Sequence, residues 1–244
     1  MRKHWARILC AGLSAALLAG CGGQPGSGGQ KIKREAVQSS EMQFTGPLDG
    51  DTIAIFDTSL GEVRAVLYPD KAPMAVENFI GLAERGYYDG TVFHRAQYGF
   101  VVQGGDATGT GKGGSSIWKG NAYPKELSDQ LHHYAGALCA AFSPDEEVSG
   151  LSQFYFVQAL PGAVDEALLG QMSENGYRQE VIDAYQAAGG LPYLDYTDTV
   201  FGQVYAGMEV VDAIASAAVD ESGRPVEDVT LNKVTVTTYT AVQP

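Results

Sequence analysis

Cysteine is scarce in this chain, which has only Cys10, Cys21 and Cys139 among its 244 residues. Cys10 lies in an N-terminal segment that we expect to be removed, and Cys21 directly follows that segment. If Cys21 is modified, Cys139 has no partner left, so we expect no intramolecular disulfide. Cys139 sits in the apolar run 137–141 without a basic neighbour, which favours a buried, inert thiol over a nucleophile.

Positive charge is scarce as well. The chain has 16 Lys and Arg against 29 Asp and Glu, and its formal net charge is −13. Binding of nucleic acid needs a basic surface, so this composition argues against a nucleic-acid partner. The length allows one domain, or at most two, with enough apolar residues for a substantial core.

The apolar run near the N terminus, 8–18, is too short to span a bilayer comfortably. It follows Arg2, Lys3 and Arg7 and is followed by small residues, the arrangement of a secretory signal peptide. Its ending, Leu-Ala-Gly-Cys at 18–21, resembles the bacterial lipobox. This resemblance implies a signal peptide at 1–20, a lipid on Cys21, and an extracytoplasmic lipoprotein anchored to the bacterial cell membrane. A plain signal peptide with an incidental cysteine is the alternative.

The residues after Cys21 are rich in Gly, Gln and Ser and have no apolar period. We therefore expect residues 21–50 to comprise the lipidated cysteine and a flexible tether, with a globular domain at 51–244. Lys31, Lys33 and Arg34 form a small basic patch in the tether, for which we expect solvation rather than contact with anionic lipid.

The stretch 93–106 reads Phe-His-Arg-Ala-Gln-Tyr-Gly-Phe-Val-Val-Gln-Gly-Gly-Asp. It predicts two short strands joined by a turn at Tyr98-Gly99. Because side chains alternate along a strand, Val101 and Gln103 should share one face, and the turn can bring Arg95 beside it. One cation, one amide and apolar surface, without a nucleophile, suit the binding of an uncharged group such as a peptide.

This stretch resembles the sequence pattern of the cyclophilins, which are peptidyl-prolyl cis-trans isomerases. Phe-His-Arg, Gly-Phe and Gln-Gly-Gly-Asp are all present at the family's spacing. The resemblance covers about 51–239 with an interruption at 162–192. It implies a mainly β fold, a closed eight-stranded antiparallel barrel capped by two helices. An ordinary hairpin with a solvated arginine is the alternative.

Helical patterns begin at Pro73 and at Met208, and these match the two helices of the family. The interruption at 162–192 contains apolar residues spaced for two further short helices, which should end at 175–176 and 189–190. We therefore expect an inserted helical hairpin beside the substrate groove. It could contact substrate or a partner, or serve only as a spacer.

The resemblance also implies roles for individual residues. Arg95 would donate a hydrogen bond to the prolyl nitrogen, and Gln103 would hold the substrate backbone. The implied substrate-binding residues are Phe100, Val101, Ala141, Phe154, Tyr155, Tyr193, Leu194 and Asp198. Neither a metal nor a cofactor is implied.

The chain departs from the family pattern at the rim of the groove. Tyr193 stands where Trp is common, Asp198 where His or Tyr is expected, and Tyr155 where the pocket has Phe. These changes leave the role of Arg95 intact and affect the rim and the peptide preference.

Two other motifs have weaker functional interpretations. The glycines of 109–114 fit a nucleotide-binding pattern, but no helix follows to offer its amide groups to phosphate, so a surface loop flanking the groove is favoured. His132 and His133 are adjacent and should point apart on any regular element, which makes a metal site improbable.

The function that follows is a peptidyl-prolyl isomerase that assists the folding of exported proteins at the membrane surface. Its partners would be proline-containing segments of those proteins and, through the lipid, the membrane, and we expect a monomer. A non-catalytic chaperone or scaffold that binds proline peptides on the same fold is the alternative. An intact Arg95 favours the isomerase, because a pure binding module has no need of a cation at the prolyl nitrogen.

Overall fold

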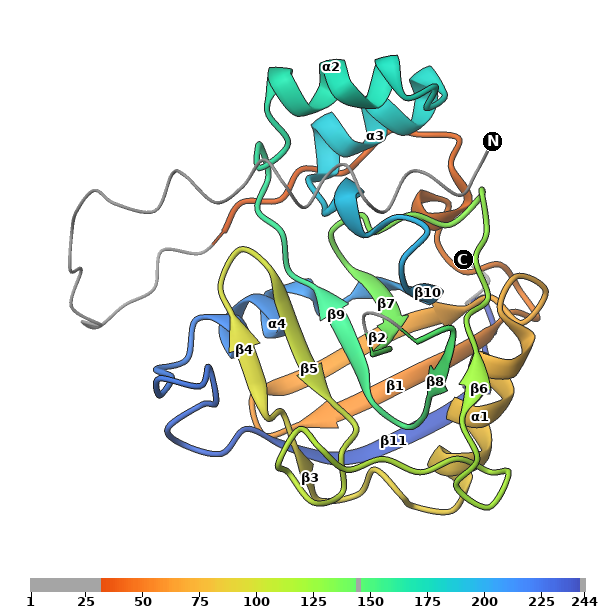
Figure 1. The fold of residues 1–244 in the computed structure, drawn as a ribbon, viewed down its shortest axis with the longest axis vertical. Coiled ribbons are helices and arrows are strands. Elements are labelled where there is room, and N and C mark those ends of the chain that lie inside the picture. Colours follow the sequence, from red (N-terminus) through yellow and green to blue (C-terminus); the bar gives the residue numbers. More distant parts are fainter. Residues whose placement is uncertain (1–31, 144–145, 242–244) are drawn as a thin grey trace. The chain divides into compact units, whose positions relative to one another are not determined.

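The computed structural model describes residues 32–143 and 146–241. The expected signal peptide, the expected lipidation site Cys21 and the tether up to residue 31 lie outside the described residues. The described part of the chain is mainly β (Figure 1).

Nine strands form one antiparallel sheet. In chain order they are β1 (Thr52–Thr58), β2 (Gly61–Leu67), β3 (Thr91–Val92), β4 (Arg95–Gln97), β5 (Val101–Gly104), β7 (Ala137–Ala140), β9 (Phe154–Val157), β10 (Thr199–Ala206) and β11 (Thr230–Thr238). A separate small ladder pairs β6 (Tyr123–Pro124) with β8 (Val148–Gly150).

The large sheet is a curled half-barrel. Its strand order is β3-β11-β1-β2-β10-β7-β9-β5-β4, so β3 and β4 are its two edges. Only Phe93 and His94 separate these edge strands in the chain, so the backbone itself holds the two edges together. No ladder joins β3 to β4 within the described residues. The expected closed barrel of eight strands is therefore not confirmed.

Two helices cover the core of this sheet, as the sequence predicts. α1 (Pro73–Glu84) begins with Pro73 in its first turn, where the missing N–H costs no hydrogen bond. The chain turns away at Gly86, whose φ of +66° is accessible to glycine without strain. α4 (Met208–Ala215) packs its buried residues, among them Val211 and Ile214, into the same core.

The centre of this core is aromatic. The Phe154 ring is 1% exposed and contacts the rings of Phe56, Phe79, Tyr88, Phe93 and Phe156. Because side chains alternate along β9, Phe154 and Phe156 face this core, whereas Tyr155 and Val157 face a second apolar cluster on the other side of the strand.

The two helices predicted for the insertion are confirmed. α2 (Glu166–Glu174) is capped by the Asp165 carboxylate, and α3 (Gln179–Ala188) ends at Gly189. Apolar residues of both helices pack together with Tyr134, which precedes β7. The insertion therefore has a small core of its own that is continuous with the segment leading into the sheet.

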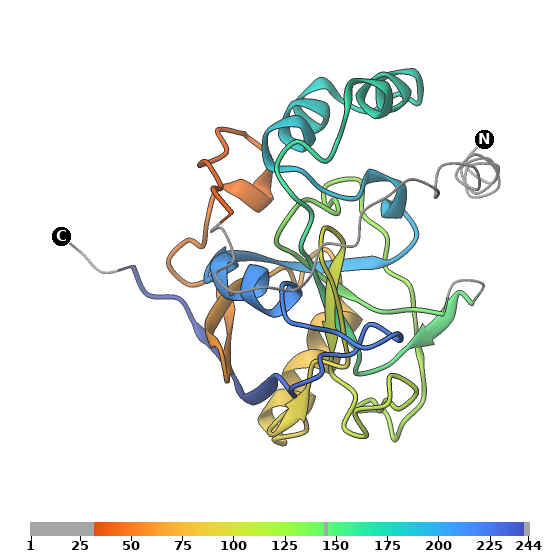
Figure 2. The same cartoon turned by 90° about the vertical axis from the view of Figure 1, so that its left-hand side faces the viewer.

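Residues 32–48, which we call the strap, differ from the expected solvated tether. The Glu41 carboxylate is buried and makes two hydrogen bonds with Arg178, at the N-cap of α3. Gln43, also buried, bonds the backbone of His132 and the side chain of Gln203 in β10. Figures 1 and 2 show the strap beside α3. This part of the chain is packed on the domain through polar contacts that apolar periodicity does not reveal.

None of the helices in the described residues combines the length and the apolar character needed to cross a membrane.

The position of Phe154 leads to a stability prediction. Phe154→Leu should lower the free energy of unfolding by at least about 1 kcal/mol, because it removes ring–ring contacts and leaves space in a close-packed core. Phe142→Leu, at a partly exposed ring, is the matched control and should cost less. Urea unfolding measures both. Unchanged stability of the Phe154 variant together with a raised KM for a proline peptide would instead place this ring in the substrate pocket.

Candidate active site

The β4–β5 hairpin places Arg95 directly opposite Gln103. The guanidinium Nη1 lies 3.4 Å from the Gln103 Oε1, and Nη2 donates to the Gln97 side chain at 3.0 Å. Gly99 allows the turn between the strands, with a φ of +78°. The expectation that this turn brings Arg95 beside Gln103 is confirmed.

Arg95 also lies over an aromatic ring. Its guanidinium carbon is 5.3 Å from the centre of the Phe100 ring. A cation over a ring face is attracted by the negative charge of that face, which restricts the orientation of the guanidinium plane. Arg95 and Phe100 are both partly exposed, so they remain accessible to a ligand.

Gln153 is a site residue that the sequence analysis did not single out. Its Oε1 accepts a hydrogen bond from Gln103 Nε2 at 2.9 Å, and its own Nε2 donates to the carbonyls of Gly111 and Gly113. This chain fixes the orientation of the Gln103 amide. Only the register of β9 against β5 indicates the contact, since Tyr155 pairs with Gln103 and Gln153 precedes that strand by one residue.

The glycine loop has its amides turned inward. The N–H groups of Thr108, Thr110 and Gly113 donate to the Asp106 carboxylate. Burial alone would raise the pKa of Asp106, but hydrogen bonds from the backbone and hydroxyl of Thr108 and from the Gly113 backbone lower it to about 2. A phosphate would have to displace this carboxylate from the amides, so the loop is built as a support for Gln153 rather than as a nucleotide site.

One apolar cluster contains most of the implied substrate-binding residues. Its members from that set are Val101, Tyr155, Phe100, Ala141 and Leu194. Phe154, which was also expected to bind substrate, is not among them. Successive residues of β9 face opposite sides, so the Phe154 ring lies in the central core and Tyr155 faces the site.

Two of the three rim departures, Tyr155 and Asp198, contact each other. The Tyr155 hydroxyl donates to Asp198 Oδ2 at 2.9 Å. Burial raises the pKa of Asp198, and the hydrogen bond from Tyr155 opposes this shift. Tyr193 stands apart, 46% exposed, in the short 3₁₀-helix η4 (Pro192–Leu194). Tyr155 and Asp198 thus compensate each other chemically at the places where the family pattern has other residues.

A buried carboxylate lies behind η4 and brings together the two histidines, which were expected to point apart on a regular element. His132 Nδ1 and His133 Nδ1 each lie 3.0 Å from an oxygen of Asp195, the residue after Leu194. The Tyr185 hydroxyl of α3 donates to the same carboxylate. Burial would raise the pKa of Asp195, but the hydrogen bonds from both histidines lower it to about 2. The segment 132–134 is irregular, so neighbouring side chains can converge.

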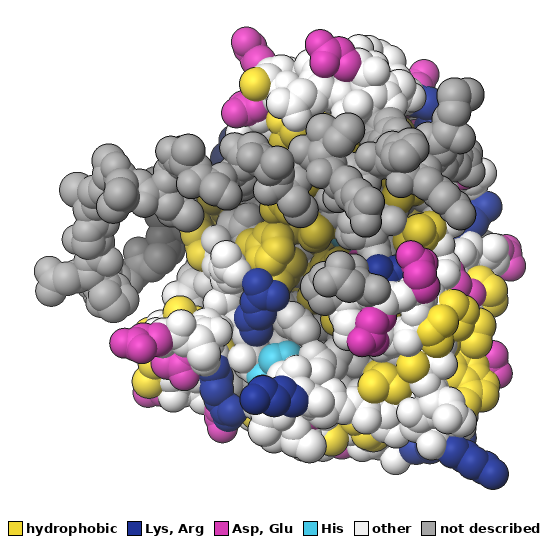
Figure 3. Space-filling model, in the orientation of Figure 1, with side chains coloured by type: hydrophobic (Ala, Val, Ile, Leu, Met, Phe, Trp, Pro, Cys, Tyr) yellow, Lys and Arg dark blue, Asp and Glu magenta, His cyan; other side chains and the backbone are white. Residues whose placement is uncertain are grey.

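The site therefore offers one cation, two linked amides and an apolar wall. On the face seen in Figure 3, hydrophobic side chains gather beside a basic one over the region of β5 and β9.

Cys139 is fully buried as predicted, and burial raises the pKa of its thiol. Among the described residues, no cluster of His, Cys, Asp or Glu is arranged to hold a metal ion.

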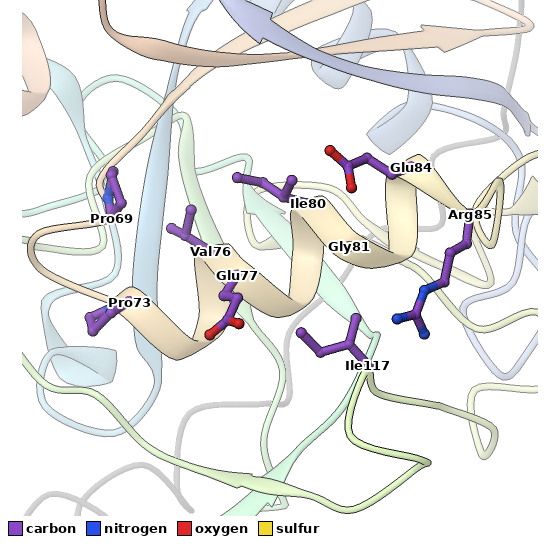
Figure 4. Close-up of a pocket in the computed structure, with 9 residues that line it drawn as sticks. All are labelled: Pro69, Pro73, Val76, Glu77, Ile80, Gly81, Glu84, Arg85 and Ile117. Atoms are coloured by element: carbon purple, nitrogen blue, oxygen red, sulfur yellow. The ribbon is translucent and has the colours of Figure 1, made fainter.

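A separate pocket lies along α1 (Figure 4). Pro69 and Pro73 lie at the N-terminal end of the helix and Arg85 beyond its C-terminal end, while Ile117 approaches it from a neighbouring loop. A Cβ on Gly81 would lie 2.7 Å from the Ile117 side chain, so glycine permits this close approach. None of the residues implied to bind substrate lines this pocket.

Comparison with known proteins agrees with this geometry. Residues 53–236 match the family described as cyclophilin type peptidyl-prolyl cis-trans isomerase/CLD. A putative peptidyl-prolyl cis-trans isomerase of Staphylococcus epidermidis is 39% identical over 188 residues, which is 77% of this chain and 93% of that protein. One of Staphylococcus saprophyticus is 37% identical over 195 residues, 80% of this chain and 96% of that protein.

A solved structure gives the same result. The cyclophilin-type isomerase of Cryptosporidium parvum, crystallised in the presence of the dipeptide Ala-Pro, is 26% identical with a TM-score of 0.62. The match covers 77% of this chain and 99% of that one. The residues of the β4–β5 hairpin, the fold around them and these relatives lead to one conclusion: the chain belongs to the cyclophilin-type peptidyl-prolyl cis-trans isomerases.

Proposed function

We propose that this isomerase acts on proline-containing segments of exported proteins at a membrane surface, with Arg95 as its catalytic residue. The observation that carries the catalytic part is the position of Arg95, held over Phe100 and opposite Gln103 at the edge of an apolar wall. The observation behind the membrane part is the sequence at 18–21.

The chemistry needs no covalent step. Rotation about an X-Pro bond is slow because the resonance of the amide must be broken. In the twisted state the prolyl nitrogen regains a lone pair, which can accept a hydrogen bond. A guanidinium that donates to this nitrogen stabilises the twisted amide more than either planar isomer, and such differential binding lowers the barrier.

The free site leaves Arg95 able to make this bond. Its contact with Gln103 is long, at 3.4 Å, and a guanidinium has five N–H donors. Gln103, oriented by Gln153, would hold the backbone of the peptide. Phe100, Tyr155 and Leu194 would contact the proline ring, with Ala141 on the groove wall. The Cryptosporidium relative was crystallised in the presence of the dipeptide Ala-Pro, which supports this class of ligand.

Arg95→Ala should lower kcat/KM for an X-Pro peptide by roughly tenfold to a hundredfold. A charged hydrogen bond contributes about 1.5–3 kcal/mol, and each 1.4 kcal/mol is about tenfold in rate. Arg95→Lys should recover little, because lysine lacks the planar fork of donors. A protease-coupled isomerisation assay measures these rates, with Arg85→Ala as the control on a distant surface. Full activity in a folded Arg95→Ala protein would favour the non-catalytic binding module.

Asp198→Asn should stabilise the folded protein at neutral pH. Burial raises the folded-state pKa of Asp198 above its unfolded value. The protonated carboxyl therefore stabilises the fold fully below the unfolded pKa, and this stabilisation is lost as pH rises through the folded pKa. Asparagine avoids the half-buried charge and can still accept the hydrogen bond from Tyr155. Urea midpoints at pH 7 and pH 4 measure the effect, and the gain should shrink at the lower pH. A variant that is less stable at both values contradicts this account of the rim.

The proposed lipid on Cys21 would hold the enzyme close to the bilayer. Acyl chains contribute about 0.8 kcal/mol per buried CH₂, so two or more of them keep a protein on a membrane. Arg34 follows Cys21 by 13 residues (34 − 21) and is bound to the domain. An extended chain spans about 3.5 Å per residue, so that attachment point would lie within roughly 45 Å of the lipid.

Cys21→Ser should move the protein from the membrane fraction to a soluble or uncleaved form. Cys139→Ser is the matched control, because that thiol is buried in the domain and should not affect partitioning. Fractionation of cells followed by immunodetection makes the measurement. The lipid anchor is excluded if the Cys21 variant partitions as the wild type does.

A further inference from the structure

The strap contains a contact outside the range matched by the family model, because residues 32–48 precede residue 53. Arg34 forms a bidentate ion pair with Asp212 of α4, with Nε 3.0 Å from Oδ2 and Nη2 2.7 Å from Oδ1. The side chains are only 19% and 11% exposed. Such planar, paired contacts are the geometry in which arginine binds a carboxylate most strongly.

The remaining donors of Arg34 reach the end of β9. Nη1 donates to the carbonyl of Ala159 at 3.0 Å and Nη2 to that of Gln158 at 3.2 Å. The guanidinium therefore joins α4 to the segment that follows the strand carrying Tyr155. Lys33, by contrast, is 86% exposed and pairs only with the exposed Glu35 among the described contacts.

Gln158 connects this contact to the catalytic hairpin. The residue is fully buried, and its Nε2 donates to Asp212 Oδ1 at 2.8 Å. Its Oε1 accepts the backbone N–H of Gly99 at 2.6 Å, and its own N–H donates to the carbonyl of Phe100 at 2.8 Å. The turn of the β4–β5 hairpin is thus held from behind by one glutamine.

The charge of Asp212 fixes which way the Gln158 amide points. A carboxylate only accepts hydrogen bonds, so the NH₂ group of Gln158 must face it, and the oxygen must then face the N–H of Gly99. Without Arg34, Asp212 would be a largely buried anion that lacks its cation. Water entry or rotation of Asp212 would then compete with the bond to Gln158, and the Gly99 amide would lose its partner.

We propose that Arg34 is a positioning residue of the isomerase. Through Asp212 and Gln158 it orders the turn at Gly99 and Phe100. Through the Phe100 ring it then fixes the orientation of the Arg95 guanidinium. The strap is then part of the active-site framework as well as the link toward the N terminus. This inference goes beyond the proposed function and rests on it only for the roles of Phe100 and Arg95.

The experiment compares Arg34→Ala with Lys33→Ala in the full-length chain, purified in detergent. Both remove one positive charge from neighbouring positions of the strap, but only Arg34 contacts the domain. Hydrogen exchange by NMR at the Gly99 amide reports the turn, and the Phe56 amide in the β1–β2 ladder reports global unfolding. Turnover of an X-Pro peptide is measured on the same samples.

Arg34→Ala should speed exchange at Gly99 at least about tenfold without a matching change at Phe56. It should also lower kcat/KM by roughly threefold to thirtyfold, since small displacements of catalytic groups are costly. Millimolar guanidinium should restore part of both effects, and Lys33→Ala should change neither. Arg34→Lys keeps the charge but lacks the planar guanidinium, so both effects should lie between those of the wild type and Arg34→Ala. This variant replaces Arg34→Ala in the test if Arg34→Ala does not fold.

The inference is overturned if exchange at Gly99 in the folded variant equals that of the wild type, or rises only in step with Phe56. Unchanged turnover alongside faster Gly99 exchange overturns it too, because the turn would then be uncoupled from the site. Full activity of Arg95→Ala would instead contradict the proposed function, and exchange at Gly99 would still show whether Arg34 orders the turn.

Discussion

The pairing of β4 with β5 is the constraint on which the site depends. It sets Arg95 opposite Gln103, and the next ladder sets Gln103 opposite Tyr155, so that cation, amide and apolar wall share one face. Register in a sheet has a period of two, and a slip of one residue would turn Arg95 toward the other face. The turn at Gly99 and the hydrogen bonds of Gln158 hold the register from one end.

The strap and the insertion both contact residues next to the site. In the strap, Arg34 donates a hydrogen bond to the Gln158 carbonyl, and Glu41 accepts one from Arg178 at the start of α3. The insertion reaches Asp195 through Tyr185, directly behind Leu194 of the apolar wall. The strap and the insertion also contact each other, through Glu41 and Arg178. This arrangement uses buried polar networks, which are specific because each donor and acceptor must find its partner.

The sequence predicts the parts of the fold that have local patterns. The hairpin, α1, α4 and the two inserted helices were predicted from turn residues, apolar spacing and glycine stops, and the structure confirms them. The sequence does not show which of Phe154 and Tyr155 faces the site, because every residue of β9 is buried and no polar alternation marks one face of the strand. The contact of Arg34 with Asp212 spans 178 residues, and no local pattern encodes it. The convergence of His132 and His133 depends likewise on an irregular backbone.

Isomerisation by the Arg95 site is the central claim, and NMR exchange spectroscopy of an Ala-Pro peptide tests it most directly. Uncatalysed cis-trans exchange takes tens of seconds, so cross-peaks between the two isomers are absent from the free peptide. A substoichiometric amount of the protein should produce these cross-peaks, with shift changes in the protein centred on Arg95, Gln103 and Tyr155. Shift changes at these residues without exchange cross-peaks would contradict the account and identify a site that binds proline peptides without turning them over.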